Sequence, residues 1–159
     1  MPVEHHEAAI REAIQLSLKS VRENLGGPFG AVIVKDRAIV SRGWNQVTTS
    51  NDPTAHAEVV AIREACRALN TFHLEGCTIY ASCEPCPMCL AAIFWARLDR
   101  IVFSATRQDA ARAGFDDELF YTELSRPLDQ RQVKSIQLCR DEALDVLREW
   151  REKPDKVAY

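Results

Sequence analysis

Residues 77 to 104 read CTIYASCEPCPMCLAAIFWARLDRIVFS and place a cysteine-rich turn between two apolar segments. The apolar run Cys77 to Ala81 predicts a short buried strand. The two prolines of the turn suit the first turn of a helix, so the apolar residues Met88 to Arg97 predict a helix after them. Arg100 to Ser104 predicts a second strand. A helix that connects two strands in this way is expected to leave them parallel.

The flanking sequence adds elements of both kinds. Apolar residues at helical spacing predict helices over residues 4–25, 54–69 and 141–150, and β-rich runs predict strands over residues 29–34, 38–44 and 133–138. The turn Lys35-Asp36-Arg37 joins the first two of these strands into an antiparallel hairpin. Asp52 or Thr54 is placed to cap the second helix. The order of elements predicts an α/β fold with a mixed, five-stranded sheet that helices cover on both faces.

The composition is that of an ordinary globular chain. Its 159 residues, 47% hydrophobic and 27% charged, predict a single domain over residues 1–159. No apolar run approaches the ~20 residues that span a bilayer, so we expect no membrane insertion. The formal net charge of −3 gives no general attraction to polyphosphate, so we expect no nucleic-acid partner.

Six cysteines could form three disulfides, but the N-terminal sequence argues for a reducing compartment instead. The first residues, Met1 to His6, show no basic start followed by an apolar signal segment, which predicts a cytoplasmic protein. In that compartment clustered cysteines are more often metal-binding or catalytic than crosslinked. Cys83, Cys86 and Cys89 form such a cluster. The other three lie in apolar patterns and are expected to pack as small hydrophobic residues: Cys66, Cys77 and Cys139.

Two short motifs carry the chemistry. The first is His56-Ala57-Glu58 at the start of the second predicted helix, and the second is the Pro-Cys-x-x-Cys pattern that contains Cys86 and Cys89. One histidine and two thiolates form a three-ligand zinc set, and a fourth position left to water is typical of a catalytic site. Glu58 is then the base that accepts a proton from that water. This pairing of motifs is the signature of zinc-dependent nucleobase deaminases, with one zinc ion per chain.

Other types of site fit the motifs less well. A closed structural zinc site would take Cys83 as its fourth ligand, and a zinc-stabilised binding module without activity would need no Glu58. Neither explains a carboxylate two residues after the histidine. The chain has no phosphate-binding loop, no dinucleotide-binding glycine motif and no nucleophile elbow, which argues against phosphoryl and acyl transfer.

The motifs extend to four longer blocks. Together these resemble the bacterial guanine deaminases of the cytidine deaminase superfamily: GGPFGAVIV at residues 26–34, NDPTAHAE at 51–58, SCEPCPMC at 82–89 and AGFDD at 113–117. The resemblance implies a three-layer α/β/α sandwich that hydrolyses guanine to xanthine and ammonia. It also implies a homodimer that exchanges C-terminal segments.

The resemblance implies a role for each matching site residue. It makes His56, Cys86 and Cys89 the zinc ligands and Glu58 the proton shuttle, with Asp117 as a second catalytic group. It also implies that five residues bind the purine: Phe29, Asn45, Ala57, Trp95 and Tyr159. From the residues alone, two of these five positions and Asp117 have simpler explanations, because Asn45 fits a strand end, Trp95 a helix core and Asp117 a helix cap.

Two questions stay open at the level of sequence. The tRNA-specific adenosine deaminases share the two zinc motifs, although they need a basic surface that the net charge of −3 does not favour, and a guanosine deaminase is a third candidate. The tail that starts at Pro154, residues 154–159, would ordinarily be a frayed terminus. The resemblance instead implies that this tail is swapped and that Tyr159 closes the active site of a partner.

Overall fold

The computed structural model describes residues 3 to 159, with side chains from His6 onward. The described chain forms two compact units, one ending at Asp117 and the other spanning Glu118–Tyr159. The first unit contains the sheet and both metal-binding motifs. The second consists of helices and extended chain.

The sheet has four strands in the order β2-β1-β3-β4. β1 (Gly30–Lys35) pairs antiparallel with both β2 (Ala38–Trp44) and β3 (Cys77–Cys83), whereas β3 pairs parallel with β4 (Arg100–Ala105). Because β2 and β3 are both antiparallel to β1, they run in the same direction. The sheet is mixed, as the sequence predicts, and both connections that contain long helices join strands of the same direction.

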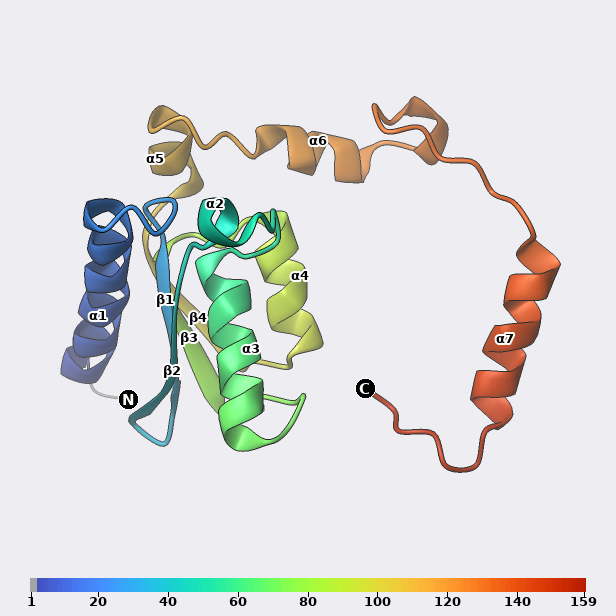
Figure 1. Cartoon of the computed structure of the whole chain (residues 1–159), viewed down its shortest axis with the longest axis horizontal. Helices are drawn as coiled ribbons and strands as arrows, with labels where there is room; N and C mark the ends of the chain where they lie inside the picture. The colour runs from blue at the N-terminus through green and yellow to red at the C-terminus, as the bar shows by residue number, and fades with distance from the viewer. Residues whose placement is uncertain (1–2) are drawn as a thin grey trace. The chain divides into compact units, whose positions relative to one another are not determined.

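Helices cover the two faces of this sheet (Figure 1). α1 (Val3–Arg22) lies on one face, and α3 (Ala57–Leu69) and α4 (Pro87–Trp95) lie on the other. Side chains of a strand point alternately to opposite faces, and β1 serves both. Ala31 and Ile33 pack in the core under α3 and α4, while the next residues along the strand pack under α1. The three-layer α/β/α architecture is therefore confirmed.

Two glycines allow helices to approach the sheet closely. A Cβ atom on Gly30 would lie 2.2 Å from the carbonyl oxygen of Ala13 in α1. A Cβ atom on Gly43 would lie 2.3 Å from the carbonyl oxygen of Ala57, the first residue of α3. The second contact matters for the site, because it fixes the end of α3 that carries Glu58.

The first unit also contains two short helices. α2 (Val47–Ser50) follows β2, and α5 (Arg107–Arg112) follows β4. α5 begins with a capping box, in which the Thr106 hydroxyl accepts from the backbone of Asp109 and the Asp109 carboxylate accepts from the backbone of Thr106. This box satisfies backbone donors at the helix start.

The second unit contains α6 (Glu118–Ser125), a 3-10 turn (Leu128–Gln130) and α7 (Arg140–Glu152). None of its residues is buried. Three large apolar residues of α7 lie at helical spacing yet are 65%, 62% and 44% exposed: Val146, Leu147 and Trp150. An amphipathic helix is stabilised when its apolar stripe is covered. Because this stripe is exposed and no residue of the unit is buried, the second unit lacks a core of its own.

Two sequence predictions need correction, and one helix was not predicted. The predicted strand over residues 133–138 is extended chain without strand pairing, so the five-strand detail is not confirmed; a strand forms only where a neighbour supplies hydrogen bonds. The second predicted helix begins at Ala57 rather than Thr54. Its N-cap is His56, without a side-chain cap, because the Asp52 carboxylate instead accepts from the backbone and hydroxyl of Thr54. α6 was not predicted, because no element was assigned to residues 118–125.

No helix within residues 3–159 combines the length and the apolarity needed to cross a lipid bilayer.

Candidate metal centre and active site

The starts of α3 and α4 present the metal-binding residues. His56 is the N-cap of α3 and Cys86 is the N-cap of α4, both with extended backbone, and Cys89 lies in the first turn of α4. Pro87 occupies the first helical position, where its fixed φ and missing N–H suit a helix start. Both helices start at the end of the sheet where β2 and β3 finish, so the three side chains converge there.

The three donor atoms lie at distances that suit zinc. The Nδ1 atom of His56 is 3.6 Å from the Sγ atom of Cys86 and 3.4 Å from that of Cys89, and all three donors lie within 4.8 Å of one another. A tetrahedral zinc ion with bonds of about 2.0 Å to nitrogen and 2.3 Å to sulfur places its ligands roughly 3.5 to 3.8 Å apart. The donor set therefore fits this metal, and the three residues form a zinc-binding site.

The thiols of this site differ in how readily they ionise. Hydrogen bonds from Cys89 and His56 lower the pKa of the Cys86 thiol to about 4. The pKa of Cys89 is raised, first by its hydrogen bond to the Cys86 sulfur and then by burial. One thiolate is thus formed readily and the second is costly without a cation, so a divalent ion offsets the repulsion between them.

Glu58 lies beside the donor set without belonging to it. Its carboxylate accepts from the Sγ atom of Cys89 at 3.5 Å, and the residue is only 7% exposed. Burial raises the pKa of this carboxyl. A carboxyl group with a raised pKa exchanges protons more easily near neutral pH, which suits a general acid and base.

Cys83 does not complete a closed site. Its thiol donates to the carbonyl oxygen of Thr106 at 3.6 Å, and burial raises its pKa to about 11. The cluster of potential donors contains only one histidine and two cysteines among the described side chains. The structure thus offers three ligands, which matches a catalytic site better than a structural one.

Asn45 lies next to the metal-binding end of the sheet with a fixed amide orientation. Its side-chain oxygen accepts from the backbone N–H groups of Gly27, at 3.0 Å, and Val47, at 3.2 Å. The residue is buried at 6% exposure. Because the oxygen is occupied by two donors, the NH₂ group is the end left to interact with a ligand.

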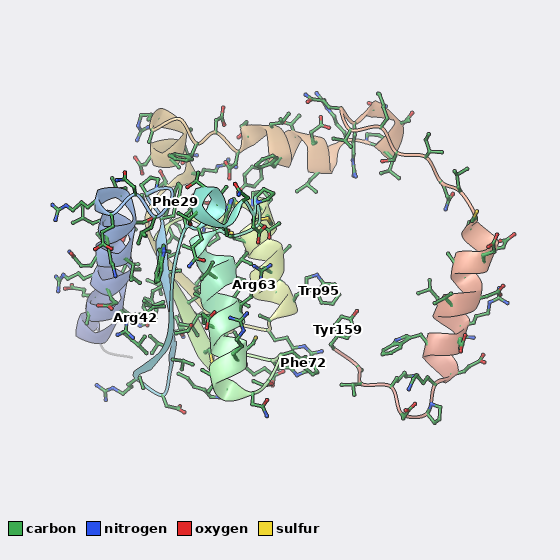
Figure 2. All side chains as sticks on the ribbon, in the orientation of Figure 1. Phe29, Arg42, Arg63, Phe72, Trp95 and Tyr159 are labelled. Carbon is green, nitrogen blue, oxygen red and sulfur yellow. The ribbon has the colours of Figure 1, made fainter. Side chains whose placement is uncertain are left out.

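Phe29 belongs to the same part of the structure. Its carbonyl oxygen accepts from the backbone of Asn45 at 3.0 Å, and its ring meets the ring of Phe115 edge to face with centroids 4.9 Å apart. Figure 2 shows Phe29 at the end of the sheet where α3 and α4 begin. Asp117 follows two residues after Phe115. Burial and the nearby Cys86 raise the pKa of the Asp117 carboxyl, so the charge of the metal site acts on this group.

The remaining three predicted residues, Ala57, Trp95 and Tyr159, lie in different parts of the structure. Ala57 is fully buried in the core as the first residue of α3, where a backbone N–H has no partner within its own helix. Trp95 is 67% exposed at the far end of α4, about 13 Å along the helix axis from Cys86 (Figure 2). Tyr159 is 70% exposed and belongs to the second unit. Within one chain, Trp95 is thus separated from the metal-binding end.

Two features of this part of the structure were not predicted from the sequence. Phe115 belongs to the AGFDD block at residues 113–117, but no role was predicted for it. The turn held by Asp52 was interpreted as a helix cap. The Asp-Pro-Thr sequence favours a local side-chain turn equally well, and that alternative signal was available.

Comparison with known proteins agrees with this site. Residues 3–105 match the cytidine and deoxycytidylate deaminase zinc-binding region. The guanine deaminase of Bacillus subtilis is 49% identical over 155 residues, which cover 98% of this chain and 99% of that protein. The tRNA-specific adenosine deaminase of Aquifex aeolicus is 48% identical over 99 residues, which cover 62% of each chain.

Solved structures give the same assignment. The crystal structure of the Bacillus subtilis guanine deaminase has a TM-score of 0.94 over 97% of this chain and 98% of that chain. A protein solved in complex with 2,6-diaminopurine is 28% identical, with a TM-score of 0.66 over 97% of this chain and 85% of that chain. This chain therefore belongs to the cytidine and deoxycytidylate deaminase zinc-binding family, on the branch of the guanine deaminases.

Proposed function

We propose that this chain hydrolyses guanine to xanthine and ammonia. The observation that carries the choice of substrate is the extent of the likeness. The guanine deaminase of Bacillus subtilis matches 98% of the chain, whereas the tRNA-specific adenosine deaminase of Aquifex aeolicus matches 62%. The zinc-binding site supplies the chemistry that both kinds of enzyme need.

His56, Cys86 and Cys89 would hold the zinc ion. When bound, zinc supplies a water molecule whose pKa is lowered from about 15.7 to about 7. Glu58 would accept one proton from the attacking water and pass it to the ring nitrogen beside the carbon that bears the amino group. It would then accept the second proton, from the hydroxyl group that the water leaves on that carbon, and pass it to the amino group, which departs as ammonia. Its burial beside Cys89 supports this role, because bulk water does not compete for the proton.

Asn45, Ala57 and Phe29 would bind the purine. The NH₂ group of Asn45 donates to the carbonyl oxygen or imidazole nitrogen of the base, since the amide oxygen is already held by two backbone donors. The backbone N–H of Ala57, at the start of α3, offers a further donor. The ring of Phe29 supplies an apolar surface for stacking.

Asp117 would distinguish guanine from adenine. Ring nitrogen 1 of guanine carries a proton that a carboxylate can accept as a hydrogen bond, and the same nitrogen of adenine has only a lone pair. A buried carboxylate left without its donor costs about 1 to 3 kcal/mol. The partial burial of Asp117 near Cys86 supports this assignment.

We also propose a homodimer that exchanges the second unit. Residues Glu118–Tyr159 contain no buried residue, and α7 exposes a stripe of apolar side chains. The outer side of α4 is also apolar, with Phe94 73% and Trp95 67% exposed. In the proposed dimer each copy covers such surfaces on the other, and the two units together form one deaminase domain.

In this dimer the far position of Trp95 and the exposure of Tyr159 have a common explanation. Both would reach the purine site of the partner copy rather than their own, with Tyr159 offering a ring, a hydroxyl group and the terminal carboxylate. Size-exclusion chromatography with light scattering tests the dimer. A mass of about 36 kDa, twice the 17.9 kDa chain, is expected, and a stable monomer would contradict it.

A cytoplasmic location completes the proposal. A site with two thiolate ligands is best maintained where thiols stay reduced. We propose neither a nucleic-acid partner nor a membrane partner, since the net charge of −3 gives no general attraction to phosphate backbones.

One experiment separates the candidate substrates. Ammonia release is measured side by side from guanine, guanosine, cytosine and adenosine in tRNA, with Glu58→Gln as the inactive control. We expect release from guanine that depends on Glu58, and at most weak release from the other three. Release from tRNA adenosine or guanosine at a rate equal to or above that from guanine would overturn the proposal.

A further inference from the structure

The loop before Asp117 is built by the end of α5. Gly114 has a φ of +92°, a conformation that side chains disfavour, and its backbone N–H donates to the carbonyl oxygen of Ala111. The backbone of Phe115 donates to the carbonyl oxygen of Ala110 at 3.0 Å. These two bonds end the helix and reverse the chain, in the manner of a glycine cap. As a result, Phe115 is directed back toward the sheet.

Phe115 then contacts the wall of the proposed purine site. Its ring meets that of Phe29 at 83°, with centroids 4.9 Å apart, which is the edge-to-face geometry that aromatic pairs favour. Phe29 is itself fixed, because its N–H donates to Gly27 and its carbonyl oxygen accepts from Asn45. Phe115 remains 45% exposed, so its ring is not a core residue and the pair with Phe29 is its defined aromatic contact.

Asp117 lies two residues beyond this contact. Two residues of extended chain span at most about 7 Å, so fixing the ring of Phe115 limits where the carboxylate of Asp117 can lie. That carboxylate is within the electrostatic influence of Cys86. The loop therefore attaches to the site at one point and presents its functional group just beyond it.

We propose that Phe115 is a positioning residue, which holds Asp117 over the purine site through the contact of its ring with Phe29. The inference rests on the proposed role of Asp117 in binding guanine. A misplacement of about 1 Å in a positioned group can cost a factor of about 100 in rate. The effect of Phe115 is thus expressed through Asp117, without any contact of Phe115 with the reacting atoms.

A double-mutant cycle tests this dependence. Guanine turnover and zinc content are measured for the zinc-loaded enzyme and for three variants: Phe115→Ala, Asp117→Ala and the double variant. Phe115→Tyr serves as the conservative variant that keeps the ring. Phe72→Ala is the matched control, because Phe72 is 47% exposed and makes a similar edge contact, with His73, but lies beyond the opposite end of α3 (Figure 2).

We expect Phe115→Ala to lower kcat/KM roughly 10- to 100-fold at unchanged zinc content. In the Asp117→Ala background the same change should cost less than about threefold, since the group that Phe115 positions is gone. Phe115→Tyr and Phe72→Ala should keep activity within about threefold.

Three results would overturn the proposal. Equal losses from Phe115→Ala in both backgrounds would show that Phe115 does not act through Asp117. Full activity of Phe115→Ala alongside an impaired Asp117→Ala would remove Phe115 alone and leave the proposed function intact. Loss of zinc in both Phe115→Ala and a milder Phe115→Leu variant would assign the residue to the metal site. Full activity of Asp117→Ala would instead refute the proposed role of Asp117, a failure that the cycle separates from the others.

Discussion

The two units of this chain differ in how they are stabilised. In the unit that ends at Asp117, strand side chains pack under helices on both faces of the sheet, and the metal-binding residues start two of those helices. In Glu118–Tyr159, no residue is buried and the apolar stripe of α7 is exposed. The first unit has the means to fold by its own contacts. The second has helices but no core.

This difference indicates that the two units have different roles, the first in the chemistry and the second in completing the site. Metal binding and proton transfer need groups held rigidly, and the first unit offers them at helix starts backed by a packed sheet. The second unit gains stability only when its apolar surface is covered. Burying apolar surface stabilises a protein by about 25 cal/mol per Å². We infer that the second unit acts when it is packed on another copy.

The largest expected effect concerns the first unit. Cys86→Ala should lose zinc and activity together, because it removes one of three ligands. Glu58→Gln should keep about one zinc per chain yet lower guanine turnover by about 100 to 10,000-fold, as expected for a general acid and base. Metal analysis and ammonia release on the same samples check both variants. Zinc loss in Glu58→Gln would make Glu58 a ligand instead.

The next prediction concerns the second unit in isolation. A peptide of residues 118–159 should show little of the helix seen for α6 and α7, since it has no buried residue and isolated helices of this length are marginal in water. Circular dichroism with a thermal scan checks this. A cooperative melting transition of the peptide would remove the contrast between the units.

A smaller effect is expected inside the first unit from Gly43→Ala. The added Cβ atom would lie 2.3 Å from the carbonyl oxygen of Ala57 and 2.6 Å from the backbone nitrogen of Ala61, so α3 must shift. We expect a loss of about 1 to 3 kcal/mol in the free energy of unfolding, with weaker zinc binding.

Gly76→Ala is the matched control for that change. Gly76 has a φ of +79°, but its nearest neighbour to an added Cβ atom is a flexible Lys35 carbon at 3.8 Å. It should lose stability through backbone strain without a change in zinc affinity, as denaturant unfolding and metal titration would show. Equal zinc affinities in the two variants would argue against a link between Gly43 and the metal site.

The smallest effect is a pH dependence of stability in the metal-free protein. Burial raises the pKa of Glu58 from its ordinary value of 4.5, so the ionised form destabilises the folded state. Below pH 4.5 the Glu58 carboxyl is protonated in both the folded and the unfolded protein, and the penalty vanishes. The penalty grows as the pH rises from 4.5 to the raised pKa of the folded protein. Metal-free Glu58→Gln should therefore be more stable than the metal-free native chain, by more at pH 8 than at pH 5. A gap independent of pH would contradict this.

Local patterns predicted the first unit well. The strand over residues 38–44 matches its predicted bounds, and both zinc motifs lie at helix starts, because alternation, proline placement and metal-ligand spacing are encoded by neighbours in sequence. The second unit was predicted less well from the sequence. The apolar alternation of residues 133–138 favours a strand, but a strand also needs an edge to pair with, and that requirement lies outside the segment.

The site shows the same division. Spacing predicted His56, Cys86 and Cys89, whereas the edge contact of Phe115 with Phe29 joins positions 86 residues apart and leaves no periodic signal. The position of Trp95 illustrates a further limit. Its apolar helix favoured a core position, yet the residue is 67% exposed. The dimer proposed above would account for this, because the core of an interface between copies has an apolar composition.

A mixed dimer tests most directly whether one copy's zinc site is completed by another copy's second unit. A chain lacking residues Asp155–Tyr159 is combined with a full-length Glu58→Ala chain under conditions that exchange subunits, and the heterodimer is isolated by two affinity tags. Each parent should have little guanine turnover. The heterodimer should regain activity, because the intact tail of the Glu58→Ala copy covers the functional zinc site of the truncated copy. Full activity of the truncated parent, or no recovery in a confirmed heterodimer, would contradict the account.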